Sequence, residues 1–245
     1  FEAKNGALSS IIHFIVEAPI KDENEIGYDG LCIDGQFPQT SMYGWEVKDS
    51  AFLAKVCPYA ELPPDLRQAT EALSPFLAEN QYRNFFALEM RDGICTDPCC
   101  RHASPGGEIL DDNIENLAEV LWGGAEGRLV EPVFKSQYGA QIVLTSEWAR
   151  DHWQLVDIPE GVREHVHLYN HCIIDGKDYV VPQFVPHFDR MKEIGSVVAL
   201  ADDPQEAIDL CKERAEQVKG FKVTCCPEEL DKALEEMNAS SGQSA

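Results

Sequence analysis

Short apolar runs separated by turn residues begin the chain. Residues 11–17 (IIHFIVE) are apolar and largely β-branched, and they predict a buried strand that Pro19 ends. Residues 26–33 (IGYDGLCI) predict a second strand. Asp34-Gly35 follows as a turn signal, so we expect a return strand from about residue 36. This part of the chain therefore predicts an antiparallel sheet.

Further Asp-Gly pairs predict two more β-hairpins. One pair, Asp92-Gly93, separates residues 85–90 from 94–96, and the other, Asp175-Gly176, separates residues 172–174 from 179–181. Single strands are expected at residues 140–144 and 194–201, whereas residues 45–55 alternate only loosely.

Helical periodicity appears between these strands. Residues 64–79 carry apolar side chains at spacings of three and four, and residues 206–218 form an amphipathic pattern behind an Asp203-Pro204 start. Residues 113–122 predict another helix, and residues 159–166 a short one. Because strands, hairpins and helices are mixed, an α+β fold with a mostly antiparallel sheet flanked by helices is favoured over a doubly wound parallel sheet. Residues 238–245 (NASSGQSA) are polar and predict a disordered tail.

The composition is that of a globular protein with a strongly acidic surface. Hydrophobic residues make up 44% of the 245 positions, and 43 acidic against 20 basic residues give a net charge of −23. Such a surface repels phosphate backbones, so a general DNA or RNA binder is not expected. Most of the carboxylates are expected to be solvated, and a few could hold a metal ion.

Nine cysteines, an odd number without a C-x-x-C pair, do not form the pattern of a secreted disulfide framework. We therefore expect reduced thiols and a cytoplasmic protein. The apolar runs are too short to span a bilayer, and no signal peptide precedes them. The chain starts at Phe1 without Met, as a processed or cloned start or a truncated gene would explain.

Two carboxylates on the hairpin of residues 85–101 are the first candidate site. Glu89 lies on its first strand and Asp97 at the end of its second, and carboxylate oxygens suit Mg²⁺. A three-residue turn would place both on one face, whereas a two-residue turn would place them on opposite faces. Arg101 follows and could bind a phosphate oxygen with its planar guanidinium group. The alternative is two solvated carboxylates on an exposed hairpin.

Glu17 and Glu25, eight residues apart, are the second candidate site. A carboxylate can accept both hydroxyl hydrogens of a ribose, and the backbone of an extended hinge, here Glu17-Ala18-Pro19, can read an adenine. The alternative is that residues 21–25 (KDENE) form only a solvated loop.

Three histidines, His165, His167 and His171, lie beside Cys172 and suggest a third possibility, a Zn²⁺ site. The alternative is surface and hydrogen-bonded core histidines. No H-E-x-x-H, G-x-S-x-G, Walker or Rossmann motif is present in the sequence.

Taken in order, these features resemble the ATP-grasp superfamily, in the branch of glycinamide ribonucleotide synthetase. Residues 15–37 (IVEAPIKDENEIGYDGLCIDGQF) look like its strand, hinge and second strand, and residues 85–108 (FFALEMRDGICTDPCCRHASPGGE) look like its two-strand metal segment. Residues 192–223 resemble its closing strand and helix. Residues 120–185 match no part of the pattern and are expected to be an elaboration of a partial ATP-grasp domain spanning residues 1–237.

The resemblance implies a role for each candidate residue. Glu17, Ala18 and Pro19 would line adenine, Glu25 would bind ribose, Glu89 and Asp97 would hold Mg²⁺, and Arg101 would face the acyl phosphate or the acceptor. Asp97-Pro98-Cys99 stands where the family has Glu-x-Asn, so the third metal ligand departs from the pattern.

The implied activity is an ATP- and Mg²⁺-dependent carboxylate–amine or carboxylate–thiol ligase acting on small molecules. The front lobe with its phosphate-binding lysines is expected to precede Phe1. The alternatives are a non-catalytic ATP-grasp-like scaffold and a metal hydrolase built on the histidines. The sequence predicts neither the substrates nor the oligomeric state.

Overall fold

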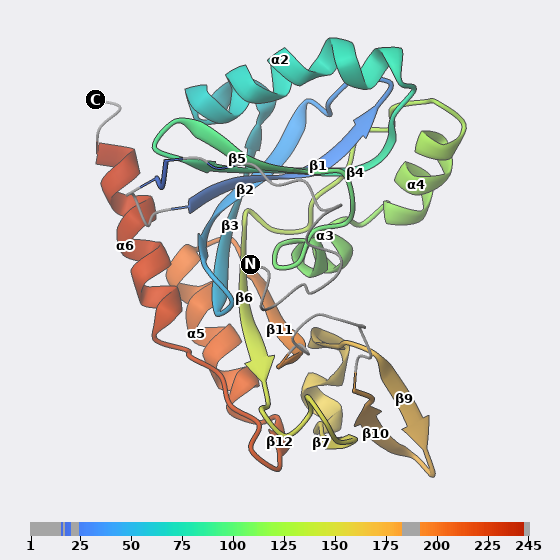
Figure 1. Cartoon of the computed structure of the whole chain (residues 1–245), viewed down its shortest axis with the longest axis vertical. Helices are drawn as coiled ribbons and strands as arrows, with labels where there is room; N and C mark the ends of the chain where they lie inside the picture. Colours follow the sequence, from blue (N-terminus) through green and yellow to red (C-terminus); the bar gives the residue numbers. More distant parts are fainter. Residues whose placement is uncertain (1–15, 17, 21–24, 183–191, 243–245) are drawn as a thin grey trace.

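The computed structural model describes residues 16, 18–20, 25–182 and 192–242. Its larger sheet has eight strands in the order β5-β4-β1-β2-β3-β6-β11-β8, and each neighbouring pair is antiparallel (Figure 1). The strands are β1 (Glu25–Ile33), β2 (Thr40–Val47), β3 (Ala51–Pro58), β4 (Arg83–Arg91), β5 (Ile94–Cys99), β6 (Tyr138–Thr145), β8 (Val166–Leu168) and β11 (Glu193–Ala201).

A second, four-stranded sheet in the order β12-β7-β10-β9 lies at one end of the molecule (Figure 1). Its strands are β7 (Gln154–Asp157), β9 (His171–Ile174), β10 (Lys177–Val180) and β12 (Lys219–Gly220). This sheet belongs mostly to the segment that the sequence left unassigned.

Helices cover both faces of the larger sheet. They are α2 (Pro64–Glu79), α3 (Gly107–Asn113), α4 (Leu117–Ala125), α5 (Pro204–Ala215) and α6 (Glu229–Gly242), with the 3₁₀ turns η2 (Tyr59–Glu61) and η3 (Glu160–His165). The α+β prediction is therefore confirmed. No helix in the described part of the chain has the length and apolar character needed to cross a membrane.

Two hydrophobic cores lie on opposite faces of this sheet. The larger core contains Tyr28, Trp45 and Leu88, and α2, α5 and α6 pack over it. The smaller core, with Met42 and Phe52, lies under α3 and α4 on the other face. On this second face, near the start of β1 and the end of β4, acidic side chains gather.

Local sequence signals explain many element boundaries. In each Asp-Gly pair, at 34–35, 92–93 and 175–176, both residues have positive φ, a conformation that Asp tolerates and Gly adopts freely. Helix α2 spans residues 64–79 as predicted, with proline in its first turn. In α5, Asp203 accepts a hydrogen bond from the Glu206 backbone N–H at 3.0 Å, which confirms the predicted cap.

Three predictions differ from the structure. The return strand after Asp34-Gly35 begins at Thr40. The single helix expected over residues 113–122 is replaced by α3 and α4, because Asn113 stops the first helix and its side chain bonds to residues 135 and 136. Residues 238–242, assigned to a disordered tail, continue α6, which is anchored by the buried Leu230 and Met237.

Candidate functional site

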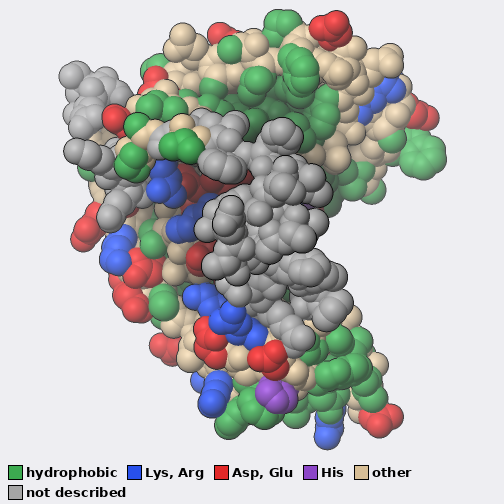
Figure 2. Space-filling view, viewed as in Figure 1, with side chains coloured by type: hydrophobic (Ala, Val, Ile, Leu, Met, Phe, Trp, Pro, Cys, Tyr) green, Lys and Arg blue, Asp and Glu red, His purple; other side chains and the backbone are tan. Residues whose placement is uncertain are grey.

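Strands β1, β2 and β4 present acidic side chains on one face of the large sheet. Glu25 on β1 lies opposite Glu46 on β2, and Gly27 lies opposite Glu89 on β4. Cross-strand partners and residues two apart share a face, so these three carboxylates project to the same side. Figure 2 shows acidic and basic side chains together on this part of the surface.

A β-bulge completes this set with Asp97. The turn at Asp92-Gly93 has two residues, which alone would put Glu89 and Asp97 on opposite faces. The register shifts between Met90 and Glu89, so that Thr96 has no partner and Asp97 lies directly opposite Glu89. The Thr96 hydroxyl donates to the Glu89 carbonyl at 3.0 Å and closes the bulge. The hairpin thus has the two-residue turn, and Glu89 and Asp97 nevertheless lie on the same face of the sheet.

Lys48, at the end of β2, ties three of the carboxylates together. Its Nζ lies 3.5 Å from Glu25 Oε1, 3.3 Å from Glu46 Oε1 and 3.4 Å from Glu89 Oε2. On the other side of Glu25, Arg91 Nε donates to Oε2 at 2.6 Å. A single ammonium group therefore occupies the space where these three carboxylates converge.

Burial and crowding control the protonation of this cluster. Burial raises the pKa of Glu46 to about 8, and the charges of Glu25 and Glu89 add to this increase while the charge of Lys48 opposes it. Burial and the charge of Glu89 raise the pKa of Asp29, on the same face of β1, to about 7. Burial acts to raise the pKa of Glu25, but the net result is a lowered pKa. The largest lowering effect is the hydrogen bond from Arg91. Glu46 and Asp29 are therefore more readily protonated at neutral pH than exposed carboxyls.

Cys99 and Arg101 border the carboxylates beyond β5. Cys99 is buried, and its thiol donates to Asp97 Oδ2 at 3.1 Å and lies 4.0 Å from Glu89 Oε1. Arg101 is exposed, and its Nη1 donates to the carbonyl of His102 at 3.1 Å. Asp29, Glu89 and Arg101 help to line a small cavity of only about 20 Å³.

A larger cavity, of about 520 Å³, adjoins this small one. The two share Ser104 and Pro105, and Tyr169 and Glu193 help to line the larger cavity. Tyr169 donates to Glu108 Oε1 at 2.8 Å and lies 2.7 Å from Ser104 Oγ. This hydrogen-bond network fixes the wall between the two cavities.

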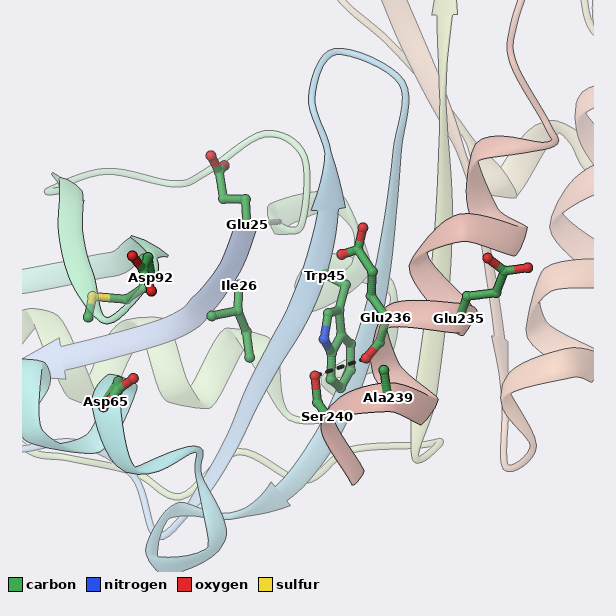
Figure 3. A pocket seen from close by; sticks show the side chains of 10 residues that line it. Glu25, Ile26, Trp45, Asp65, Asp92, Glu235, Glu236, Ala239 and Ser240 are labelled. Atoms are coloured by element: carbon green, nitrogen blue, oxygen red, sulfur yellow. Dashed lines mark hydrogen bonds between the residues drawn. The ribbon is translucent and has the colours of Figure 1, made fainter. Parts of the chain in front are cut away.

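Another cavity, of about 580 Å³, lies near Ile26, Trp45 and Met90, which project to the helix-covered face of the sheet. Figure 3 shows Glu25 projecting to the opposite side of its strand from Ile26. Glu25 nevertheless borders this cavity at the start of β1, whereas Glu89 and Asp97 do not line it.

The structure brings Glu25, Glu89, Asp97 and Arg101 to one face of the sheet. Ala18 and Pro19, expected at an adenine hinge, lie in exposed irregular chain, and Glu17 lies outside the described residues. The hinge therefore stays a prediction.

The three histidines do not converge. His165 lies 3.5 Å from Glu164, His167 lies 3.2 Å from Asp112, and His171 lies 2.8 Å from Asp178. Within the described ranges, the groups whose ligand atoms gather closely enough for a metal ion are Glu89 with Asp97 and Cys99, and Glu89 with Glu25 and Glu46. The histidines thus interact with separate carboxylates, as the alternative interpretation expected.

Several residues of the site did not emerge from the sequence. Glu46 and Lys48 are the main ones, because residues 40–47 were not recognised as a strand opposite β1. Asp29 was hidden inside the strand 26–33, where its i, i+2 and i, i+4 spacing to Gly27 and Glu25 was the available signal.

Comparisons with known proteins agree with this architecture. Phosphoribosylamine–glycine ligase from Thermotoga maritima matches 82% of this chain with a TM-score of 0.61 and 16% identity. The biotin carboxylase subunit of pyruvate carboxylase matches 84% with a TM-score of 0.52 and 14% identity. The biotin carboxylase domain of Hydrogenobacter thermophilus 2-oxoglutarate carboxylase, solved with MgADP and bicarbonate, matches 86% with a TM-score of 0.53 and 12% identity.

The chain has the ATP-grasp fold. It spans 54%, 48% and 49% of the lengths of these three structures, respectively. No protein-family model matches the sequence, and no curated protein matches it significantly. The ATP-grasp resemblance is thus confirmed at the level of the fold.

Proposed function

We propose that this chain contributes the metal- and nucleotide-binding face of an ATP-dependent ligase, which activates a carboxylate as an acyl phosphate for attack by an amine or a thiol. One observation carries the proposal: Glu89 and Asp97 lie opposite each other across β4 and β5, on a fold whose solved relatives include one with MgADP bound. Because those relatives are less than 25% identical to this chain, the proposed activity is inferred from the site residues and not from the structural similarity.

Glu89 and Asp97 would hold the divalent cation, since two carboxylates on one face supply hard oxygen ligands. Mg²⁺ held there would neutralise the charge of nucleotide phosphates. Arg101 would bind the transferring phosphoryl group, because its guanidinium lies at the border of the same small cavity as Glu89.

The nucleoside is assigned to the start of β1. Glu25 would accept ribose hydroxyls, and the segment Glu17-Ala18-Pro19 would contact adenine. Since Arg91 and Lys48 already approach Glu25, a ribose would share this carboxylate with Arg91. The cavity of about 520 Å³ beyond Ser104 and Pro105 has room for a small-molecule substrate next to the phosphoryl group.

We infer a cytoplasmic location from the thiols, since all nine cysteines are free. No role for nucleic acid or a membrane is proposed.

A second candidate function is a non-catalytic module of the same fold. The position of Lys48 favours it, because an ammonium group between Glu25, Glu46 and Glu89 neutralises the cluster without a metal ion.

Calorimetric titration of the chain with a non-hydrolysable ATP analogue, with and without Mg²⁺, separates the two candidates. The ligase proposal predicts metal-dependent binding that Glu89→Ala abolishes and Glu25→Ala weakens. Glu119→Ala, at an exposed position on α4, is the matched control and should bind as the wild type does. Nucleotide binding that is unaffected by Glu89→Ala would contradict the proposed site, and no binding at millimolar nucleotide would favour the non-catalytic module.

A further inference from the structure

Glu89, Asp97 and Cys99 form a mixed group of metal ligands. One ligand atom from each, two carboxylate oxygens and the Cys99 sulfur, lie within 4.8 Å of one another. Cys99 Sγ is 3.1 Å from Asp97 Oδ2 and 4.0 Å from Glu89 Oε1. Ligands of a single ion show such separations: with metal–oxygen distances of about 2.1 Å and metal–sulfur distances of about 2.3 Å, bond angles between about 90° and 130° span this range.

The two oxygens of Glu89 face different neighbours. Oε2 lies 3.4 Å from Lys48 Nζ, whereas Oε1 lies on the side of Cys99. Lys48 therefore occupies the group formed with Glu25 and Glu46, and a divalent cation is directed to the side of Glu89 that Asp97 and Cys99 share.

The strand geometry selects Cys99 over its neighbours. Cys99 lies opposite Ala87, two residues from Glu89, so its side chain is on the carboxylate face. Cys95 lies opposite Met90, which packs in the core of the other face. The bulge at Thr96 lies between these two cysteines and places Cys99 on the face opposite to that of Cys95.

We propose that Cys99 is the third protein ligand of this cation site and that its sulfur makes the site prefer thiophilic divalent ions, such as Zn²⁺, Co²⁺ or Cd²⁺, over Mg²⁺. This inference rests on the proposed function for the location of the site. A thiolate is a soft ligand, whereas Mg²⁺ requires oxygen ligands in near-octahedral geometry. On binding, the sulfur–metal bond forms as the thiol proton, now donated to Asp97, leaves to solvent.

The test uses Cd²⁺ as the probe, added to the reduced 245-residue chain without nucleotide and followed by its sulfur-to-metal charge-transfer absorption. We expect one tight equivalent that resists a large excess of Mg²⁺. Cys99→Ser should lower the Cd²⁺ affinity about tenfold or more, because one ligand of a charged ion is lost. It should also remove the charge-transfer band, which requires the sulfur. Cys95→Ser, on the same strand but the other face, is the matched control and should retain both.

Two more variants keep the test decisive if Cys99→Ser folds poorly. Asp97→Asn, at an exposed position, should weaken Cd²⁺ binding but keep the band at saturation, because the sulfur remains. Cys99→Asn should shift the preference towards Mg²⁺, since an amide oxygen is a hard ligand. An unchanged band in Cys99→Ser, equal loss in Cys95→Ser, or displacement of Cd²⁺ by equimolar Mg²⁺ would overturn the proposal.

Nucleotide binding is measured separately on the same samples. A chain that binds Cd²⁺ through Cys99 but binds no nucleotide would contradict the proposed function and leave this metal site in place. Mg²⁺-dependent nucleotide binding together with a Cd²⁺ band that Cys99→Ser leaves unchanged would support the proposed function and overturn the present inference.

Discussion

Glu89 and Asp97 are cross-strand partners on β4 and β5, although a regular ladder from the two-residue turn between them would place Asp97 opposite Leu88. The extra residue is Thr96. A bulge in one strand of a hairpin re-aims every side chain beyond it, and here it turns Asp97 and Cys99 towards the carboxylate face. With this two-residue turn, the shared face of Glu89 and Asp97 therefore results from one unpaired residue.

Deletion of Thr96 tests whether cation binding needs the bulge itself or only the pairing of Glu89 with Asp97. The shortened hairpin would pair Glu89 with Asp97 in a regular ladder, so we expect divalent-cation affinity within a few-fold of the wild type. Asp97→Asn keeps the bulge and loses a charged ligand, and should weaken binding about tenfold or more. Cation titration of both variants gives the comparison, and equally severe loss in the two would show that the bulge geometry itself is required.

Lys48→Met removes the ammonium group that separates Glu25, Glu46 and Glu89. Because the Lys48 side chain is 53% exposed, we expect a loss of only about 1 kcal/mol in the free energy of unfolding at pH 7. At pH 5 more of the carboxyls are protonated and the loss should shrink. Urea unfolding at both pH values measures it, and a loss of the same size at pH 5 would mean that Lys48 acts through packing rather than charge.

Glu46→Gln tests the raised pKa of this buried carboxyl. Burial raises its pKa from 4.5 to about 8, so the folded state keeps a proton that the unfolded state releases. The corresponding stability is fully present below about pH 4.5 and is lost as the pH rises to about 8. We expect Gln to flatten this decline by about 2 kcal/mol, less than the full shift implies because neighbouring carboxyls share the proton.

The measurement for Glu46→Gln is the free energy of unfolding at intervals from pH 5 to pH 8, without divalent cations. Glu119→Gln, at an exposed site, should follow the wild type. Parallel pH profiles for Glu46→Gln and the wild type would contradict a buried proton at this position.

Tyr169→Phe tests the wall between the two adjacent cavities. The Tyr169 hydroxyl forms hydrogen bonds with Glu108 and Ser104. Because Glu108 is buried, loss of this hydroxyl should lower the free energy of unfolding by about 1 kcal/mol. Tyr179→Phe is the matched control, since the structure gives its hydroxyl no hydrogen bond within the described ranges, and it should change little. Thermal or urea unfolding that shows equal effects for the two would argue against this network.

The elements with strong local signals could be predicted from the sequence. The three Asp-Gly turns and the capped start of α5 are encoded within a few residues, and α2 combines an apolar period with Pro64 at its start. Strand β2 was missed for a physical reason: residues 41–46 are buried on both faces, so the alternation that marks a half-buried strand is absent. Without β2, neither Glu46 nor Lys48 could be placed.

The candidate site was predicted in its residues but not in its geometry. Glu25, Glu89, Asp97 and Arg101 were all named, yet the register of the hairpin was open because a bulge leaves no clear signal in one sequence. The departure at Cys99 was visible as a missing Asn, while its position next to Asp97 required the structure. Long-range pairing, not local preference, decides such contacts.

The most direct test of the central claim is a crystal structure of this chain with ADP and Mn²⁺, in which the anomalous signal locates the metal. The account predicts a peak within ligand distance of the Glu89 and Asp97 oxygens, with the diphosphate next to it and the ribose near Glu25. A metal peak at His165, His167 or His171, or a diphosphate bound beside Trp45 and away from Glu89 and Asp97, would contradict it.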